Sequence, residues 1–359
     1  MERIHATYRI AAAAAHIRAR AEALAVEQSV EMPLEAIADR HVLDEIVAKV
    51  EDIRPGGDAF EVVLGLAPAT TGNEASQLMN MLFGNCSLQP DVELVDVEFP
   101  PAYAKHFAGP RFGIEGIRSA AGVHGRALTC TALKPQGASI EHLAGLARTF
   151  ALAGIDVIKD DHGIADQSYC SFESRVHAVQ RAIHAANHES GGRTLYAPSF
   201  SGEPSALKVQ AQIAKDCGVA MAMVAPMLVG IPSFVELQVD LDIPVMAHPA
   251  FAGTGRIAAP LLLGKLFRLF GADAIIFPNH GGRFAFGRDT CLAIARAARE
   301  PWADVPPALP VPAGGMSVER VPEMLEGYGR DTMLLIGGGL LAAGDQLLER
   351  SRRFVAAVR

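Results

Sequence analysis

The sequence predicts an α/β protein in two parts. An N-terminal α+β (ferredoxin-like) domain is expected over residues 1–113, and a C-terminal (β/α)8 TIM barrel over residues 114–359. Apolar and polar residues alternate along the strands of the first part, whereas from about Arg126 short, continuous apolar runs alternate with longer helical patterns. A chain of 359 residues, 50% of them hydrophobic, can bury the core that such a barrel needs.

The N-terminal part mixes strands with helices, as an α+β domain does. A helix is expected over residues 73–82, with Asn73 as its cap. Pro100 and Pro101 should end the last strand, because proline has no N–H to give to a strand ladder. Four strands are predicted, at Ala6–Ile10, Ile46–Ile53, Ala59–Leu66 and Val92–Phe99.

The C-terminal part contains short runs that are apolar on both faces, as the strands of a parallel sheet are. Eight such runs lie at Ala127–Leu133, Ile155–Ile158, Thr194–Pro198, Ala220–Val224, Ile243–Ala247, Ala274–Phe277, Leu309–Val311 and Met333–Ile336. Helical stretches such as Ile140–Ala153 separate them, and Gly154 stands where that helix should end. Eight units favour a closed barrel. An open, doubly wound sheet is the alternative, but no G-x-G-x-x-G motif follows a first strand.

Composition argues against several classes of function. The net charge is −8 and the basic residues are not clustered, so we expect neither nucleic acid nor a membrane as a partner. No apolar run is long enough to span a bilayer, and the N-terminus lacks the pattern of a signal peptide. The five cysteines are an odd number without a CxxC pair, which fits free thiols in a reducing cytoplasm.

In a barrel of this kind the active site lies where the strands end. The second predicted strand is followed by Lys159-Asp160-Asp161-His162, a density of oxygen and nitrogen donors that suits a hard divalent cation. An ammonium group repels a metal ion, but a neutral lysine that adds carbon dioxide becomes a carbamate and can bind one. The alternative is a turn with solvated charges.

Glycine-rich loops follow the seventh and eighth predicted strands. Gly314-Gly315 and Gly337-Gly338-Gly339 each precede a helix, which is the usual arrangement of a phosphate site in a barrel. Tight turns are the alternative use of such glycines. We therefore expect a phosphorylated small molecule as substrate, with Arg283 either pairing with its phosphate or lying on the surface.

Three further side chains at the strand ends are candidates for catalysis. Lys134 follows the first predicted strand, and a partly desolvated lysine there can act as a general base. His248 and His280 could donate protons or bind substrate oxygens. Each also has a plain structural alternative: a solvated or phosphate-pairing lysine, or a buried histidine with its hydrogen bonds satisfied. With a cation, these residues fit the enolisation of a sugar phosphate.

The motifs Leu133-Lys134-Pro135, Gly154 to Asp161, Pro312 to Gly315 and Gly337 to Gly339 resemble the large chain of the ribulose-bisphosphate carboxylase (RuBisCO) superfamily. The similarity covers nearly the whole chain. It implies a homodimer whose active sites lie between subunits, Mg²⁺ as cofactor, and a carbon dioxide molecule bound as a carbamate.

The resemblance also implies a role for individual residues. Lys159 matches the carbamylated lysine, Asp161 a magnesium ligand, and His162 stands where the family has a glutamate ligand. Lys134 matches the lysine that takes the proton, and His248 an active-site histidine. Asn85 and Glu27 match residues that complete the site across the dimer.

Departures from the family pattern argue against carbon dioxide fixation. The loop after the sixth strand, Phe277–Phe284, has no lysine, Gln136 replaces a second lysine, and Pro249 replaces an arginine that binds phosphate. The chain thus resembles the RuBisCO-like proteins, which enolise without fixing carbon dioxide. We expect a 5-methylthioribulose-1-phosphate isomerase. The alternatives are a decarboxylase, transcarboxylase or hydrolase acting on 3-oxo-isoapionate 4-phosphate, and a non-catalytic sugar-phosphate sensor.

Overall fold

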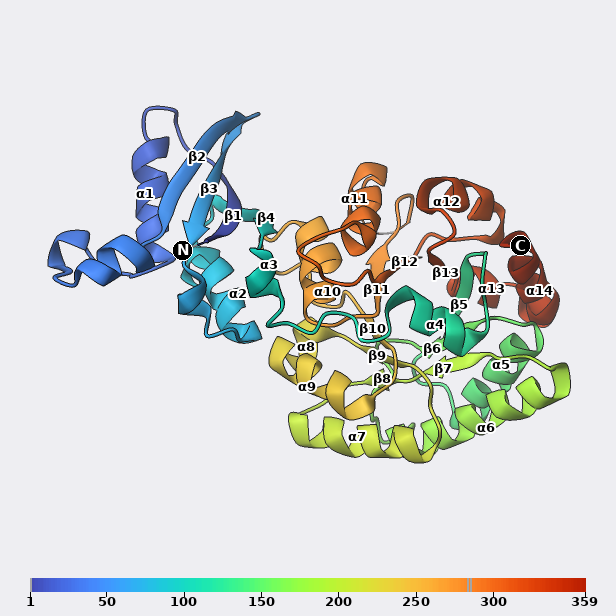
Figure 1. Ribbon diagram of the computed structural model, residues 1–359. Coiled ribbons are helices and arrows are strands. Elements are labelled where there is room, and N and C mark those ends of the chain that lie inside the picture. The colour runs from blue at the N-terminus through green and yellow to red at the C-terminus, as the bar shows by residue number, and fades with distance from the viewer. Residues whose placement is uncertain (1, 283, 285) are drawn as a thin grey trace. The chain divides into compact units, whose positions relative to one another are not determined.

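A computed structural model describes residues 2–282, 284 and 286–359 (Figure 1). The chain divides into two units. The first is Met1–Ala108 with Ala252–Leu262 and Pro301–Val305, and the second is Gly109–Phe251, Leu263–Glu300 and Pro306–Arg359. The sequence analysis did not predict that the two short segments belong to the first unit. It also placed the end of the first domain at residue 113, five residues after Ala108.

The first unit is an antiparallel sheet in the order β2-β3-β1-β4, with helices between its strands. This order and the β-α-β-β-α-β sequence are those of the ferredoxin-like fold, as predicted. Its strands are β1 (Ile4–Ile10), β2 (Lys49–Gly56), β3 (Ala59–Leu66) and β4 (Val92–Glu98), and its helices are α1 (Ile17–Glu27), α2 (Ala75–Phe83) and α3 (Pro101–Ala104).

Two details of this unit differ from the prediction. β2 begins at Lys49 rather than Ile46, because residues 42–46 form a π-helical turn whose carbonyl groups bind the guanidinium of Arg3. The cap of α2 is Glu74, not Asn73: the Glu74 carboxylate accepts hydrogen bonds from the N–H groups of Ser76 and Gln77, each at 2.9 Å.

A segment from the C-terminal half of the sequence extends the sheet at β4. The backbone of Leu94 donates to the carbonyl of Arg256 and accepts from the N–H of Ala258, both at 2.9 Å. The Arg256 guanidinium donates to the backbone carbonyls of Ser87, Gln89 and Val92. This pairing covers the edge of β4, which would otherwise expose unpaired backbone groups.

The second unit is a parallel barrel in which strand neighbours follow the chain order, and β13 pairs with β5. β7 and β8 are two pieces of one strand: β7 pairs with β6, and β8 pairs with β9. The break falls at Pro198, which lacks an N–H but whose carbonyl accepts from the Met223 N–H at 2.9 Å. The strands are β5 (Leu128–Leu133), β6 (Val157–Asp160), β7 (Leu195–Ala197), β8 (Ser199–Phe200), β9 (Ala222–Val224), β10 (Val245–Ala247), β11 (Ala274–Pro278), β12 (Leu309–Ala313) and β13 (Met333–Leu335).

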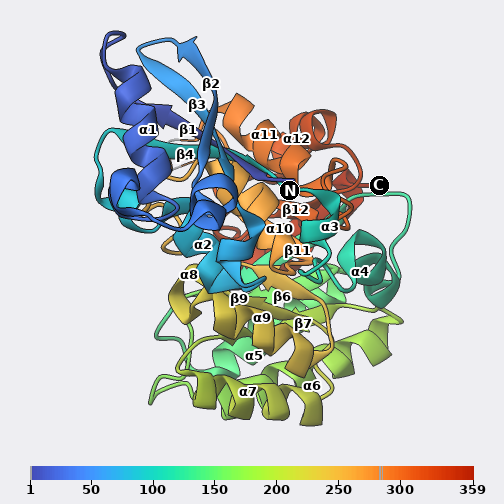
Figure 2. The same cartoon turned by 60° about the vertical axis from the view of Figure 1, so that its left-hand side comes forward.

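Helices surround these strands, and each predicted apolar run overlaps a barrel strand, so the predicted (β/α)8 barrel is confirmed (Figures 1 and 2). The helices are α4 (Gly113–Ala121), α5 (Ile140–Leu152), α6 (Phe172–Ser190), α7 (Pro204–Asp216), α8 (Pro226–Val229), α9 (Ile231–Leu241), α10 (Phe267–Leu269), α11 (Arg288–Arg299), α12 (Val321–Tyr328), α13 (Gly338–Leu341) and α14 (Leu347–Ala357). A π-helical stretch, Pro260–Leu266, runs into α10.

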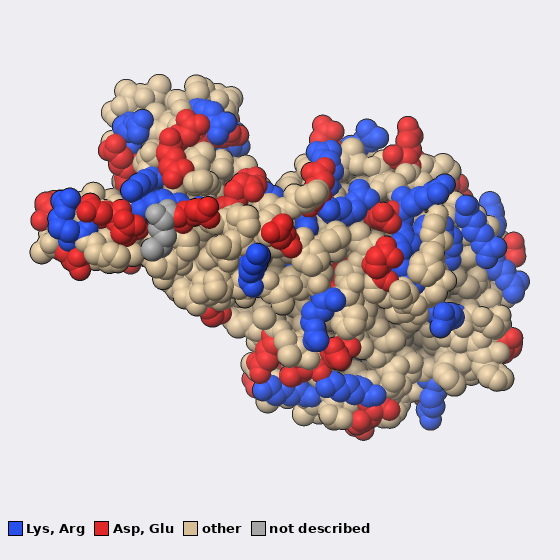
Figure 3. Space-filling view, in the orientation of Figure 1, with Lys and Arg blue, Asp and Glu red and all other residues tan. Residues whose placement is uncertain are grey.

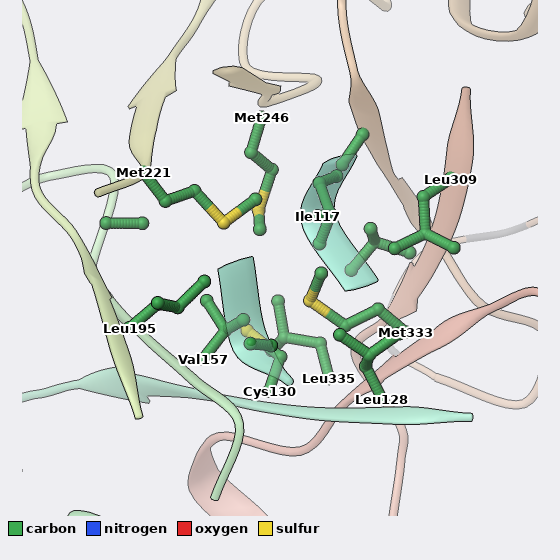
Figure 4. Packing of buried hydrophobic residues seen from close by; sticks show 14 of the residues in the cluster. Ile117, Leu128, Cys130, Val157, Leu195, Met221, Met246, Leu309, Met333 and Leu335 are labelled. Atoms are coloured by element: carbon green, nitrogen blue, oxygen red, sulfur yellow. The ribbon is translucent and has the colours of Figure 1, made fainter. Parts of the chain in front are cut away.

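The interior of the barrel is filled by apolar side chains from alternate strand positions (Figure 4). Leu128 and Cys130 of β5, Val157 of β6 and Met246 of β10 belong to this buried cluster, and Ile117 of α4 packs against them. Because successive side chains on a strand point to opposite faces, the next inward positions on these strands are also fixed. They carry the candidate site residues described below.

Acidic and basic side chains are interspersed over the face drawn in Figure 3. Within residues 2–282, 284 and 286–359, no helix combines the length and the apolar composition needed to cross a bilayer.

A buried ion pair fixes the orientation of β6. Asp160 and Arg175 of α6 are both fully buried, and the Arg175 Nε donates to Asp160 at 3.0 Å. The Asp160 carboxylate also accepts from the Tyr196 hydroxyl at 2.8 Å and the Ser199 N–H at 3.0 Å. Although burial alone would lower the pKa of Arg175, Asp160 beside it raises that pKa above its ordinary value. Asp160 therefore faces the helices and is a structural residue.

We predict that Asp160→Ala lowers the free energy of unfolding by about 3–5 kcal/mol, because it leaves the buried Arg175 charge without its partner. Urea unfolding at pH 7 measures this. The control is Glu236→Ala, which breaks an exposed pair with Lys208 and should cost less than about 1 kcal/mol. An Asp160→Ala variant as stable as the control variant would show that the pair does not anchor β6.

Candidate active site at the carboxyl ends of the barrel strands

Strand alternation places two of the predicted site residues inside the barrel mouth. Val157 belongs to the interior cluster, so Lys159 and Asp161 follow it on the inner face while Asp160 faces out. Lys159 pairs in register with Ala132 of β5 and Ala197 of β7. These small neighbours leave room for its long side chain, which is only 3% exposed.

The side chain of Lys159 is buried. Its Nζ donates a hydrogen bond to the backbone carbonyl of Asp160 at 2.7 Å. Burial lowers the pKa of Lys159 below its ordinary value, more than Cys130 and Asp161 raise it. A lower pKa increases the fraction of neutral amine, which is the form that can attack carbon dioxide.

Asp161 forms an ion pair with Lys134, the lysine that follows β5. Nδ1 of His162 lies 3.6 Å from the same carboxylate oxygen. Burial by itself would raise the pKa of Asp161, but hydrogen bonds from His162 and Lys134, together with the charges of Lys134 and Lys159, hold it well below its ordinary value. The carboxylate is thus ionised at neutral pH and is the acceptor of the site.

The imidazole rings of His162 and His248 stack on each other, with centroids 4.4 Å apart and planes 12° from parallel. Burial, with the nearby charges of Lys159 and His162, lowers the pKa of His248 to about 2. Its Nδ1 accepts a hydrogen bond from the Ala250 N–H at 3.1 Å, so the proton of the neutral ring lies on Nε2. His248 is therefore placed to donate a neutral hydrogen bond rather than to act as a cationic acid.

The predicted phosphate loops lie together, and glycine is needed for them to do so. A Cβ on Gly315 would lie 2.3 Å from the Cα of Gly282, and a Cβ on Gly339 would lie 2.9 Å from the carbonyl oxygen of Met316. The loops after β11, β12 and β13 are therefore in mutual contact. The loop after β13 also adjoins the lysine of β5, since a Cβ on Gly337 would lie 3.9 Å from Lys134 Cε.

The N–H groups of these loops are available to a ligand. In the part of the chain that the structure describes, the N–H groups of Gly314, Gly315 and Gly337 make no backbone hydrogen bond. Gly314 and Gly315 both have a positive φ, 78° and 64°. Gly338 begins α13 next to them. Bare N–H donors in a glycine-rich loop can bind the oxygens of an anion.

His280 is held in a cluster with α12 rather than in the histidine stack. Its Nε2 lies 2.9 Å from Glu323 Oε1 and 3.2 Å from Arg320 Nη2. Glu323 and Arg320 were missed by sequence reasoning, although their i, i+3 spacing just after the glycine loop is a signal for a charged pair. Arg283, the predicted phosphate partner, lies outside the described residues.

Glu27 and Asn85 occur together in the first unit. The Asn85 side-chain amide donates to Glu27 at 3.1 Å and to Glu31 at 2.8 Å. Glu31 was not among the predicted residues and has a positive φ of 53°, which turns the chain after α1. The amide and two carboxylates form one polar group on this unit.

The residues present fit a divalent cation only if Lys159 is modified. Among the residues that the structure describes, no three His, Cys, Asp or Glu side chains are grouped to hold a metal ion. A carbamate on Lys159 is not one of these four side-chain types. It would add oxygen ligands beside the Asp161 carboxylate and the His162 ring. The Asp160 carboxylate is not available, because it already accepts hydrogen bonds from Arg175, Tyr196 and Ser199.

The chain is similar in sequence to proteins of one known family. The sequence model of the ribulose bisphosphate carboxylase large chain, catalytic domain, matches residues 113–282. A protein of Rhodospirillum rubrum named 5-methylthioribulose-1-phosphate isomerase is 53% identical over 99% of this chain and 96% of its own length. A protein of Geobacillus kaustophilus named 2,3-diketo-5-methylthiopentyl-1-phosphate enolase is 36% identical over 78% of this chain and 70% of its own.

The fold matches a solved structure over its full length. The crystal structure of a RuBisCO-like protein from Rhodopseudomonas palustris has a TM-score of 0.93 and 50% identity, and covers 100% of this chain and 98% of that chain. The sequence similarity and the shared fold together show that the chain belongs to the RuBisCO-like proteins of the ribulose-bisphosphate carboxylase large-chain family.

Proposed function

We propose that the protein is a 5-methylthioribulose-1-phosphate isomerase of methionine salvage that does not fix carbon dioxide. One observation carries the proposal: a lysine, Lys134, lies between an ionised carboxylate, Asp161, and a glycine loop with free N–H donors. A base beside an anion-binding loop suits proton transfer on a small phosphorylated substrate. The relative from Rhodospirillum rubrum carries the name of this activity.

Each residue would have one task in the reaction. The loops at Gly314-Gly315 and Gly337-Gly338 would bind the phosphate through their N–H groups. Released from Asp161 and having lost its own proton, the neutral Lys134 amine would take the proton from the carbon next to the ketone and return it to the former ketone carbon. The proton of the neighbouring hydroxyl would pass to the ketone oxygen, so that the product is an isomer. The neutral His248 would donate a hydrogen bond from Nε2 to a substrate oxygen.

We also propose a divalent cation, Mg²⁺, as cofactor. Asp161 and a carbamate on Lys159 would hold it through oxygen atoms, with His162 or a water as a further ligand. When bound, the cation would stabilise negative charge on the sugar oxygens. The lowered pKa of the buried Lys159 amine supports the carbamate, because only the neutral amine reacts with carbon dioxide.

We propose a homodimer as the functional form. Asn85 and Glu27, held together in the first unit with Glu31, would complete the active site of the partner subunit. The amide and carboxylates could then bind substrate hydroxyl groups, which accept and donate hydrogen bonds equally well.

A second candidate activity is the enolisation named for the Geobacillus kaustophilus relative. The same lysine would take a proton from 2,3-diketo-5-methylthiopentyl 1-phosphate, and a bound cation would stabilise the negative charge of the enolate. Incubating the protein with each compound in deuterated water, Mg²⁺ and bicarbonate, and following both by NMR, decides between them. Turnover of the diketone alone would replace the isomerase proposal with the enolase.

Replacing Lys134 tests its role as the base. Lys134→Met should slow exchange of the substrate's α-proton by about 10²–10⁴-fold, the usual contribution of a general base. Mg²⁺ binding, measured by calorimetry, should be retained. Lys208→Met removes an exposed lysine of α7 and serves as the control. Exchange at the unaltered rate in the Lys134 variant would assign the base to another residue.

Replacing Lys159 tests the carbamate. The unaltered protein in ¹³C-bicarbonate should show a carbamate resonance by NMR, and Lys159→Ala should lose it. The variant should also bind Mg²⁺ at least about 10–100-fold more weakly, since that is the cost of losing even a partner of a metal ligand. Because the pKa of Lys159 is lowered, the resonance should appear at a lower pH than the carbamate of an exposed lysine. A carbamate signal retained in the variant would contradict the assignment.

Replacing His162 tests its place beside the cation. His162→Glu would add a carboxylate ligand, which Mg²⁺ prefers to imidazole, so the variant should bind Mg²⁺ about tenfold more tightly. His184→Glu introduces the same charge on the exposed face of α6 and should leave Mg²⁺ affinity unchanged. Equal affinities in the two variants would mean that His162 does not face the cation.

A further inference from the structure

Arg320, the residue just before α12, holds two of the active-site loops at once. Its Nη1 donates to the backbone carbonyl of His280 at 3.0 Å and to that of Gly315 at 2.8 Å. One carbonyl belongs to the loop after β11 and the other to the glycine loop after β12. Arg320 therefore links the two loops through a single nitrogen.

The guanidinium is itself held in place by a carboxylate and an imidazole. Arg320 Nε lies 3.1 Å from Glu323 Oε2, and Nη2 lies 3.2 Å from Glu323 Oε1. Glu323 also contacts His280 Nε2 at 2.9 Å. A hydrogen bond from Arg320, and to a smaller extent one from His280, lowers the pKa of Glu323 to about 2. Its carboxylate is therefore charged throughout the neutral range.

The two carbonyl groups that accept hydrogen bonds from Arg320 determine where the N–H groups of the same peptides point. In a trans peptide the C=O and N–H vectors are opposed, so the N–H groups of Gly281 and Met316 are directed away from the guanidinium. The contact between Gly282 and Gly315 transmits this arrangement across both loops, because no side chain separates them. A Cβ on Gly281 would lie only 3.2 Å from Arg320 Nη1, so the charge lies directly behind the loop backbone.

We propose that Arg320 is a positioning residue for the phosphate of the substrate. It fixes the peptide planes that carry the N–H groups of Gly281 and Met316, and it adds a positive charge behind the loop that carries the free N–H groups of Gly314 and Gly315. Glu323 and His280 hold its guanidinium in the required plane. The inference rests on the proposed function, since it takes the phosphate of the substrate as the ligand of these loops.

Two substitutions at Arg320 separate charge from geometry. Arg320→Met should raise both KM for 5-methylthioribulose 1-phosphate and Kd for inorganic phosphate by about tenfold, as expected for loss of charge-assisted hydrogen bonds. Its kcat should stay within about twofold, because the base and the cation site are untouched. Arg320→Lys keeps the charge but lacks the planar fork, so it should recover only part of the phosphate affinity.

The control is Arg350→Met, which removes a guanidinium from α14 that pairs with Glu319 at 2.5 Å. Phosphate binding by calorimetry, steady-state kinetics and thermal unfolding are measured for all three variants. Arg350→Met should keep the phosphate affinity of the unaltered protein. A variant that merely destabilised the fold would lower kcat through loss of active protein and would leave KM unchanged.

Four outcomes would overturn the inference. Phosphate affinity within about twofold of the unaltered protein in Arg320→Met would show that the loops are positioned without it. If Arg320→Lys bound phosphate as tightly as the unaltered protein, Arg320 would act through its charge alone and would not position the loops. Failure of the unaltered protein to bind phosphate would overturn the proposed phosphate site, and the inference with it. A loss of kcat with unchanged KM would make the role of Arg320 structural only.

Discussion

The side-chain alternation of β6 is the constraint on which the candidate site depends. Lys159 and Asp161 face the barrel interior only because Asp160 between them faces outward, where Arg175, Tyr196 and Ser199 bind it. A slip of one residue would exchange these faces. It would bury Lys159 and Asp161 against the helices and bring Asp160 inward without its partners. The buried ion pair thus determines which carboxylate faces the barrel interior.

The site combines one carboxylate with several nitrogen bases in a chain whose net charge is −8. Burial disfavours the charged forms of Lys159 and His248, while Asp161 remains ionised because Lys134 and His162 bind it. Local surroundings, rather than net charge, therefore make the barrel mouth suitable for an anionic substrate. Asp161 forms an ion pair with Lys134, the proposed base, and the same carboxylate would be a ligand of the proposed cation.

Most of the fold could be predicted from the sequence, because hydrophobic periodicity is a local signal. The strands of the barrel and of the first unit follow from apolar runs and alternation, whereas the order β2-β3-β1-β4 of the first sheet is set by pairing between distant segments. Three features could not be read this way: the break of one strand at Pro198, the π-helical turn held by Arg3, and the joining of residues 252–262 to the first unit. Each depends on partners distant in sequence.

The sequence by itself determined the chemical content of the site: a lysine after β5, Lys159 with Asp161 and His162 after β6, and glycine loops after β12 and β13. These positions follow from strand ends, which local patterns mark. Only the tertiary structure decided which side chains meet. It stacked His162 on His248, directed His280 toward Glu323, and placed Arg320 behind two loops. Such contacts join residues far apart in the chain, and packing alone sets their distance and orientation.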